Sequence, residues 1–430
     1  MGCPARIGAV LSRFRTRLAT IAGAGFALRA VVALAVPPAV SADSGDQRFF
    51  HVSANLLADG HGFIIPSQWL VSGASIPATE HPPLWSGVLA LFSLLGARRV
   101  DAHELVGCGV GAVTICCAGL IGRRVAGERS GVLAALGCAA FPVFVVMDGS
   151  LMSEPLYALC VALVLLAALR FAEVRTLRAG AVLGLAIGVS SLVRFEALAL
   201  IVLLVLPLAL RMPSRRPAHL AVACLTALAV IAPWCVRNSV ALDEPLLVST
   251  EMGPVLAGAN CGGTYSGYDM GYWRASCVTH APDPNSAFAS ERLTRLGIRY
   301  VRHHAARLPA VEGVRLLRTF GLWQPTRLVY FAEGRYRPGR SWAVLACWAI
   351  FALAIAGAAV LWRIDRLRLA ILLAPVALAV LITLLAFGYP RFRYAADVAL
   401  IVLAAVACDA LIGRLGIRAR RRVGRAVSSA

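Results

Sequence analysis

The sequence contains no lysine, so its 42 basic residues are all arginine. Charged residues of both signs make up only 15% of the chain, against roughly 25% in a typical soluble domain. Hydrophobic residues reach 59%, and several apolar runs approach the roughly 20 residues that cross a bilayer as a helix. The scarcity of charge therefore excludes an ordinary soluble domain and predicts an all-α polytopic membrane protein.

A formal net charge of +20 would suggest a nucleic-acid partner if the protein were soluble. Here the arginines cluster between apolar runs, and such clusters orient transmembrane helices by staying on the cytoplasmic side. We therefore exclude nucleic acid as a partner. Basic residues that are all arginine, together with abundant Ala, Leu and Val, are typical of a GC-rich bacterial genome, which favours a bacterial plasma membrane.

The chain also lacks any Cys-x-x-Cys pair and any His-rich metal-binding spacing. Most of its 12 cysteines lie inside apolar runs, where we interpret them as small packing residues. Cys261 and Cys277 differ, because both lie in one long polar segment. If that segment faces an oxidising compartment, they are the only plausible disulfide pair.

Arginine clusters decide the predicted topology. Arg13 and Arg17 precede the first apolar run, so the N-terminus should be cytoplasmic. The run 84–96 is too short to cross comfortably, and a crossing there would put every later cluster outside, so we interpret it as an interfacial helix. About ten spans with both termini inside then remain: 18–36, 105–122, 132–147, 155–169, 179–192, 198–210, 219–235, 342–362, 369–387 and 395–412.

The resulting map has two polar parts on the outer side of the membrane. The first apolar run, 18–36, has a competing interpretation, as part of a signal peptide that is cleaved after Val40-Ser41-Ala42. The map consists of a cytoplasmic N-terminus (1–17), the first transmembrane helix (18–36), a first outer loop (37–104), a six-helix block (105–235), a long outer loop (236–341), three transmembrane helices (342–412) and an Arg-rich cytoplasmic tail (413–430).

Three carboxylates, Asp43, Asp46 and Glu80, share the first outer loop. Charged groups beside a membrane are costly unless they have a function. Near an apolar surface a carboxyl group has a raised pKa and can act as a general base, and two together can instead hold a divalent metal ion, with Glu80 as a candidate ligand. Asp43 has a structural alternative, as the cap of a helix that starts near Ser44. Glu80 precedes Pro82-Pro83, a pair that fixes the chain direction.

Arginines on the predicted outer side require a functional reason, because the orientation rule places positive charge on the cytoplasmic side. Arg391 and Arg393 lie between two spans, and an anionic ligand such as a lipid phosphate would supply that reason. In the long outer loop, residues 290–320 have helical spacing of apolar and Arg residues. This pattern predicts either a basic amphipathic helix that holds lipid phosphates or a solvated helix packed on the bundle.

Taken together, these stretches resemble the bacterial GT-C glycosyltransferases, relatives of the protein O-mannosyltransferases (glycosyltransferase family 39) and of the lipid A aminoarabinose transferase. The resemblance rests on GDQRFFHVSANLLADGHGF followed by HPPLW, and on SEPLY, SLVRFEAL, APWCVRN and PRFRY in the matching order. It spans nearly the whole chain. It implies a multi-span bundle with interfacial helices in the first outer loop. It also implies transfer of a sugar from a polyprenyl-phosphate carrier on the outer, periplasmic face.

Carried over residue by residue, the resemblance implies that Asp46 is the catalytic acid of the first loop and Glu80 the acid before the Pro-Pro pair. Gln47 follows Asp46, unlike the Asp-Glu pair of the O-mannosyltransferases, so the arrangement is closer to that of the aminoarabinose transferase. We expect an inverting hexosyl or pentosyl transfer in which Asp46 removes a proton from the acceptor hydroxyl, with Asp43 as the other candidate base.

The leaving phosphate needs positive charge or a metal ion beside it. The expected partners are a polyprenyl-phosphate sugar donor, membrane lipid and an acceptor whose class (glycan, lipid or protein) the sequence does not identify. The competing interpretation is a transporter or flippase for lipid-linked sugars. The expected phosphate ligands are Arg391, Arg393, Arg237 and Arg318, and the expected substrate contacts are His81 and Tyr394.

Overall fold

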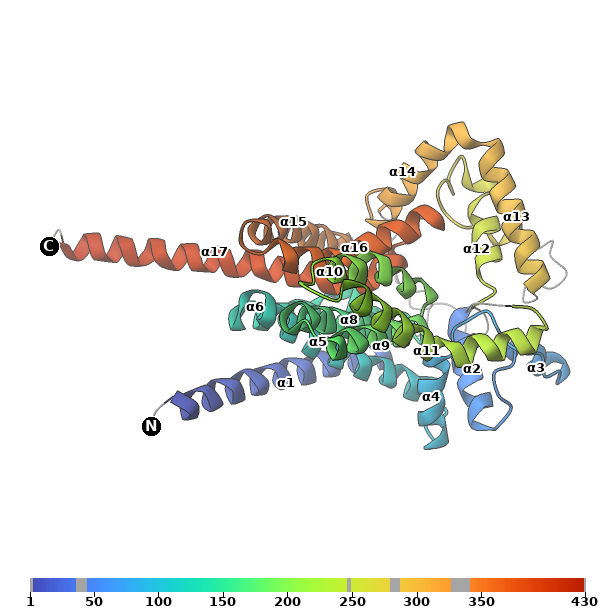
Figure 1. The fold of residues 1–430 in the computed structure, drawn as a ribbon, viewed down its shortest axis with the longest axis horizontal. Coiled ribbons are helices and arrows are strands. Elements are labelled where there is room, and N and C mark those ends of the chain that lie inside the picture. The colour runs from blue at the N-terminus through green and yellow to red at the C-terminus, as the bar shows by residue number, and fades with distance from the viewer. Residues whose placement is uncertain (1–2, 36–44, 246–248, 279–286, 326–340, 429–430) are drawn as a thin grey trace.

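The computed structural model of the chain describes residues 3–35, 45–245, 249–278, 287–325 and 341–428 (Figure 1). These residues are nearly all helical, and the only β-structure among them is an isolated antiparallel bridge between Ile64 and Pro77. The predicted all-α class is therefore confirmed.

Seven of the described helices are long and apolar enough to cross a membrane. A helix of 20 residues is about 30 Å long, which matches the hydrocarbon core of a bilayer. The chain is thus a multi-pass membrane protein. The seven helices are α1 (Cys3–Ala35), α5 (Val100–Ala126), α8 (Glu154–Val174), α11 (Arg216–Leu242), α15 (Ser341–Ile364), α16 (Arg366–Leu385) and α17 (Tyr394–Ser428).

The other three predicted spans are short or broken helices. One break has a simple cause, because Pro142 has no amide hydrogen with which to continue the helix before it. Irregular backbone of this kind is tolerated at membrane depth where protein surrounds it. The elements are α6 (Glu128–Ala140) and α7 (Pro142–Met147), α9 (Leu177–Ser191), and a 3-10 turn (Phe195–Ala199) followed by a π turn (Ile201–Val205) and α10 (Leu206–Leu210).

Small residues let the bundle helices approach closely. A Cβ on Gly184 of α9 would come within 2.2 Å of the Ala223 carbonyl oxygen in α11, so only glycine fits there. One buried ion pair also ties the bundle together. Arg29 of α1 is fully buried and donates to Asp148 at 2.5 Å, and the Tyr394 hydroxyl donates to the same carboxylate at 2.6 Å. A charge inside the bundle is thereby paired rather than exposed to lipid.

The two predicted outer loops fold into short helices that gather at one end of the molecule, at the right of Figure 1, whereas both termini lie at the left. A disulfide joins Cys261 to Cys277 within the second group, the pair expected from the sequence. The elements are α2 (Asp46–Ala58), α3 (Pro66–Ser72) and α4 (Leu84–Leu94) in the first loop, and α12 (Met252–Ala259), α13 (Ala287–His303), α14 (Leu308–Thr319) and the 3-10 turns Gly262–Thr264, Ala275–Cys277 and Ala305–Arg307 in the second.

The helix predicted to be interfacial is α4. Its 11 residues extend about 16 Å, roughly half the hydrocarbon thickness. Leu91 and Leu94 on this helix are 61% and 64% exposed, as expected for side chains that face lipid. Which side of the membrane each loop occupies stays a prediction.

Candidate active site

A cavity of about 400 Å³ lies where the loop helices meet the bundle. Its lining has a polar part with charges of both signs, called the polar wall here, and an apolar part, called the apolar wall, to which α16, residues 195–199 and several loop residues contribute. The polar wall includes His81, Arg194, Glu196, Glu251, Tyr389 and Arg391, and the apolar wall includes Leu198, Ala199, Leu381, Ile382 and Leu385.

Asp46 contacts two of these cavity-lining residues. It opens α2 directly after Gly45, whose φ of 88° is a left-handed conformation that glycine adopts without strain. A carboxylate in the first turn of a helix is stabilised by the helix dipole. Its Oδ2 accepts a hydrogen bond from Nη2 of Arg391 at 2.7 Å, and its Oδ1 lies 3.8 Å from Nε2 of His81.

Arg391 lies in the 3-10 turn Pro390–Arg393 and joins two carboxylates. Besides Asp46, its Nε donates to Oε1 of Glu154, the first residue of α8. Glu154 is only 1% exposed and also accepts from Nη1 of Arg194 at 2.8 Å. Arg194 in turn pairs with Glu196. The result is a chain of five alternating charges, of which Arg391, Arg194 and Glu196 line the cavity.

His81 links Asp46 to a further acid. Its Nδ1 lies 3.6 Å from Oε1 of Glu251, the residue before α12. The imidazole packs against the rings of Phe49 and Phe50, with centroids 4.6 Å and 5.1 Å away. A side chain held in this way between two carboxylates can accept a proton from one and pass it to the other.

The two acids beside His81 differ in their affinity for protons. Burial acts to raise the pKa of Asp46, but Arg391, His81 and Arg194 outweigh it and lower the pKa to about 2. Burial raises the pKa of Glu251, and the positive charges nearby oppose this only in part. Asp46 is thus held ionised, while Glu251 binds a proton more readily.

Known proteins share both sequence and fold features with this chain. Residues 80–236 match the sequence model of the family described as dolichyl-phosphate-mannose-protein mannosyltransferase. No curated protein matches the sequence. Among solved structures, the archaeal oligosaccharyltransferase AglB from Archaeoglobus fulgidus, in complex with an inhibitory peptide and a dolichol-phosphate, has a TM-score of 0.51 at 16% identity, over 96% of this chain and 52% of AglB.

The resemblance to GT-C glycosyltransferases is confirmed. The apo form of the Archaeoglobus fulgidus oligosaccharyltransferase gives a TM-score of 0.52 at 14% identity, over 95% of this chain and 52% of that one. ArnT from Cupriavidus metallidurans, bound to undecaprenyl phosphate, is less similar, with a TM-score of 0.46 at 16% identity over 91% and 78% of the two chains. The present chain spans about half the length of the oligosaccharyltransferases that it matches.

Within this GT-C fold, the expected phosphate ligands separate into two groups. Arg391 lines the cavity, as expected for a ligand of the carrier phosphate. Arg393 is fully buried and donates to Asp397 at 2.8 Å and to the Thr319 carbonyl, so the structure does not bring it to the cavity. A 3-10 turn rotates by about 120° per residue. The side chains of Arg391 and Arg393, which are two residues apart, therefore point in different directions.

Arg237 and Arg318 also lie outside the cavity wall, because their guanidinium groups bond to loop backbone. Arg237 donates to the carbonyls of Ala78 and Phe63, and Arg318 donates to those of Met270 and Tyr268. These contacts give both arginines a structural role in holding the loop helices together. Neither arginine lines the cavity, and phosphate binding by either one stays a prediction.

The expected substrate-binding residues and acids also separate into residues that line the cavity and residues that do not. His81 lines the cavity, whereas the Tyr394 hydroxyl is buried against Asp148 inside the bundle and does not reach it. Glu80 does not line the cavity. Its carbonyl accepts from the Ser249 hydroxyl at 2.5 Å, which ties the first outer loop to the second. Asp43 lies outside the described residues.

Sequence reasoning missed Arg194 and Glu251, which line the cavity, and Glu154, which pairs with Arg391. Glu154 and Arg194 entered the sequence analysis only inside the SEPLY and SLVRFEAL stretches. A charged residue that begins a helix in an apolar segment was the available signal for Glu154. Glu251 gave no comparable signal, because it lies in a polar loop where acids are common.

The described residues do not form a set of ligands for the expected divalent ion. Such ions need several oxygen ligands that converge on one point. In the part of the chain that the structure describes, no group of three or more His, Cys, Asp or Glu side chains is spaced to hold a metal ion. Asp46 is already bonded to Arg391.

Proposed function

We propose that the chain is a membrane glycosyltransferase that moves a sugar from a polyprenyl-phosphate carrier to an acceptor hydroxyl, on the outer face of a bacterial plasma membrane. Two findings support the proposal. The matched family model describes mannosyl transfer from a dolichyl-phosphate carrier, and AglB, which shares the fold, is a glycan-transferring enzyme solved with dolichol-phosphate. The observation that carries it is the bridge that Arg391 makes between Asp46 and Glu154 at the cavity wall.

The cavity has the two-sided character that such a donor requires. Its apolar wall, with Leu381, Ile382 and Leu385 of α16, offers a surface for the prenyl chain. Its polar wall offers Arg391 to the phosphate, whose oxygens match the fork of a guanidinium. The sugar would then lie beside His81 and Glu251.

In the proposed reaction, Asp46 takes the proton from the acceptor hydroxyl as its oxygen attacks the anomeric carbon. The bond between that carbon and the phosphate oxygen breaks, and the electron pair leaves with the polyprenyl phosphate. The configuration at the anomeric carbon is therefore inverted. The phosphate gains one negative charge, which Arg391 is placed to stabilise. The proton taken by Asp46 can pass through His81 to Glu251.

Arg391 links donor binding to the strength of the base. While Arg391 is paired with Asp46, the low pKa of this carboxyl makes it a weak base, since base strength follows pKa. An anionic phosphate in the cavity competes with Asp46 for the guanidinium. When Arg391 turns toward the phosphate, the pKa of Asp46 rises and the carboxylate becomes a better proton acceptor.

The test is to supply purified protein with a panel of labelled polyprenyl-phosphate sugars and to follow both products. A transferase releases free polyprenyl phosphate in proportion to the sugar transferred. A flippase moves the labelled lipid between leaflets of a vesicle and leaves it intact. Movement of intact donor without release of polyprenyl phosphate would refute the proposal.

A further inference from the structure

Helix α13 carries four arginines on one face. Arg292, Arg295, Arg299 and Arg302 follow one another at intervals of three, four and three residues. At roughly 100° per residue they fall within an arc of about 80°, along about 15 Å of the helix. All four side chains are exposed. We call this row the α13 arginine stripe.

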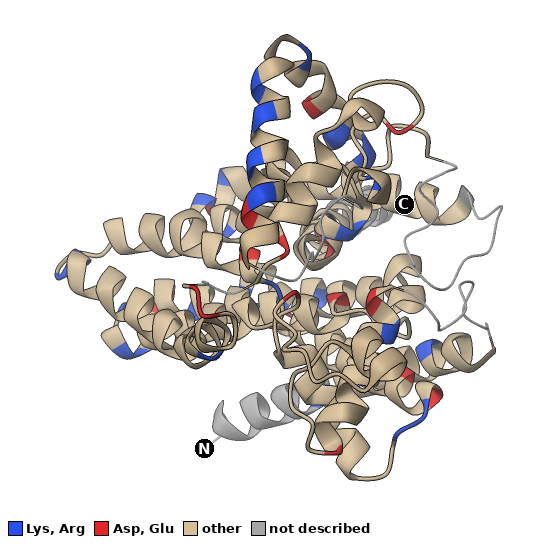
Figure 2. Cartoon of the chain, turned by 90° about the vertical axis from the view of Figure 1, so that its right-hand side faces the viewer, with Lys and Arg blue, Asp and Glu red and all other residues tan. Residues whose placement is uncertain are grey.

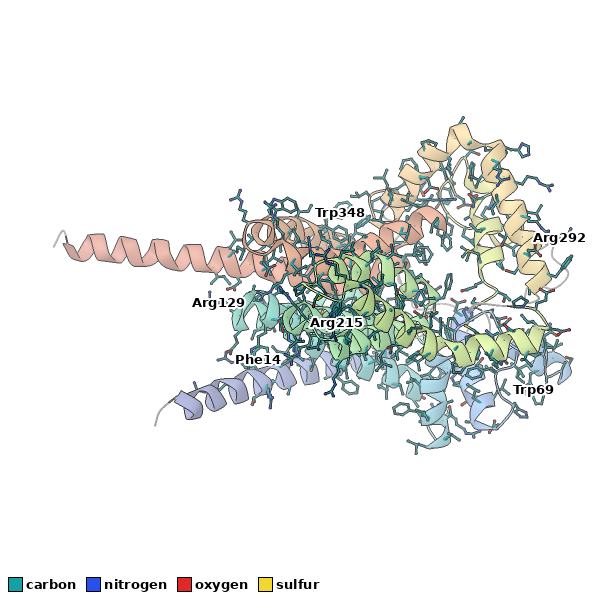
Figure 3. The ribbon with its side chains drawn as sticks, viewed as in Figure 1. Phe14, Trp69, Arg129, Arg215, Arg292 and Trp348 are labelled. Carbon is teal, nitrogen blue, oxygen red and sulfur yellow. A yellow bond between two sulfur atoms is a disulfide. The ribbon has the colours of Figure 1, made fainter. Side chains whose placement is uncertain are left out.

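The stripe points away from the bundle. The opposite face of α13 is buried through Ser290, Leu293 and Gly297, and it packs on α12. Figure 2 looks directly onto this end of the molecule and shows basic segments along the front of α13. In Figure 3, Arg292 lies at the right-hand margin, on the far side of α13 from the bundle. Headgroups of the membrane that surrounds the bundle are therefore not the natural partner of the stripe.

Little within the described structure neutralises these charges. One ion pair reaches the stripe, between Arg295 and Glu291 at 3.2 Å, and both partners are about 60% exposed. Like charges three and four residues apart on a helix repel each other. An arginine row that is exposed and self-repelling gains stability when a partner with several negative charges lies along it.

The stripe is only one helix away from the cavity. Ser290 of α13 donates to the Thr250 carbonyl at 2.6 Å and accepts from the Gly253 amide at 3.2 Å. Glu251, which lines the cavity and approaches His81, lies between those two residues. At the Ser290 end of α13, a chain bound along the stripe would therefore be separated from the polar wall of the cavity by the width of α13, roughly 10 Å.

We propose that the α13 arginine stripe docks an anionic glycan that bears carboxylate or phosphodiester groups, and that this glycan is the acceptor. The assignment rests on the proposed transferase function, because a glycan brings the hydroxyl groups that such a reaction consumes. Guanidinium forks match both carboxylate and phosphate. One exposed ring lies close by, since His304, just past the end of α13, stacks on Tyr300 at 4.0 Å and presents its outer face to a sugar.

Binding of labelled polygalacturonate and labelled phosphomannan to the full-length protein in detergent tests the proposal. The wild type should bind at least one of them, and added salt should weaken the binding. The variant R292Q/R295Q/R299Q/R302Q should bind about tenfold to a hundredfold more weakly, as the loss of four exposed ion pairs predicts. The matched control R170Q/R178Q/R211Q/R363Q, which removes four exposed arginines at the other end of the bundle, should bind as the wild type does.

Each other outcome overturns the docking assignment. Equal binding by the stripe variant, or no binding of either glycan to the wild type, would remove the stripe as the site. Equal affinity for polyglutamate would show that charge alone is recognised, and competition by anionic phospholipid vesicles would identify lipid as the partner. Asp46→Asn should bind glycan normally, so failure of the transferase proposal and failure of the docking proposal give different results. In an active preparation, the stripe variant should raise KM for the glycan and leave kcat unchanged.

Discussion

Replacing Asp46 by Asn tests the proposed base most directly. Asn keeps the size of the side chain and removes its charge. A positioned general base contributes about a hundredfold to ten-thousandfold in rate, or about 3–5 kcal/mol, and we expect transfer to fall by that amount. The structural cost should be smaller. Lowering the pKa of Asp46 from 3.8 to about 2 corresponds to about 2 kcal/mol in favour of the folded state.

The assay is sugar release from a labelled polyprenyl-phosphate donor, with thermal unfolding in detergent as the measure of folding. Asp59→Asn is the matched control. Asp59 follows the same helix, α2, and its 2.7 Å pair with Arg98 is exposed and takes no part in the cavity lining, so its loss should leave transfer unchanged. Wild-type rates in Asp46→Asn, with normal folding, would refute the role of Asp46 as base.

The pH dependence of kcat/KM separates Asp46 from Glu251. The pKa of Asp46 is lowered, so its contribution to stability is complete above the ordinary value of 3.8 and disappears as the pH falls through about 2. Asp46 therefore stays ionised in the unliganded enzyme between pH 5 and pH 8. The pKa of Glu251 is raised above 4.5, so any acid limb should belong to Glu251 and vanish in Glu251→Gln. An acid limb that survives this substitution would contradict the assignment.

Three further predictions concern the framework around the site. Glu154→Gln should destabilise the protein by about 3–5 kcal/mol in thermal unfolding, because two arginines lose a shared buried partner, and unchanged stability would contradict the buried charge chain. Reducing the disulfide between Cys261 and Cys277 should cost about 3 kcal/mol and raise hydrogen exchange in α12 and α13 first; equal exchange before and after reduction would count against it. Reporter fusions after Trp85 and Arg99 should both report the outer side, and a cytoplasmic signal at Arg99 would overturn the ten-span topology.

The spans could be predicted because one physical rule decides them. A helix in lipid satisfies its own backbone and needs a continuous apolar run, so composition and length suffice for α1, α5, α8, α11, α15, α16 and α17. The shorter elements depended on neighbours. Residues 195–210 form three different kinds of turn in sequence, and nothing in their apolar character reveals this before the surrounding helices are in place.

Residues of the site could be predicted only where both the type of side chain and its place in a predicted outer loop indicated a function. Asp46 and Arg391 were both expected, but not as partners, since 345 residues separate them in the chain. Arg391 and Arg393 look equivalent in PRFRY, yet one lines the cavity and the other pairs with Asp397 in the bundle. Sequence spacing does not report the direction of a side chain in a short 3-10 turn.

The acids on the polar wall also favour a transferase over a flippase. A flippase must bind an anionic lipid and release it unchanged. A carboxylate about 4 Å from a phosphate opposes that binding by about 4 kcal/mol at the effective dielectric of a protein surface. Asp46, Glu154, Glu196 and Glu251 all lie at or beside the cavity, against two arginines and His81. Such acids would weaken the binding of the anionic donor in a protein that only transports it. They become useful when one of them must take a proton from an acceptor, which only the transferase reaction requires.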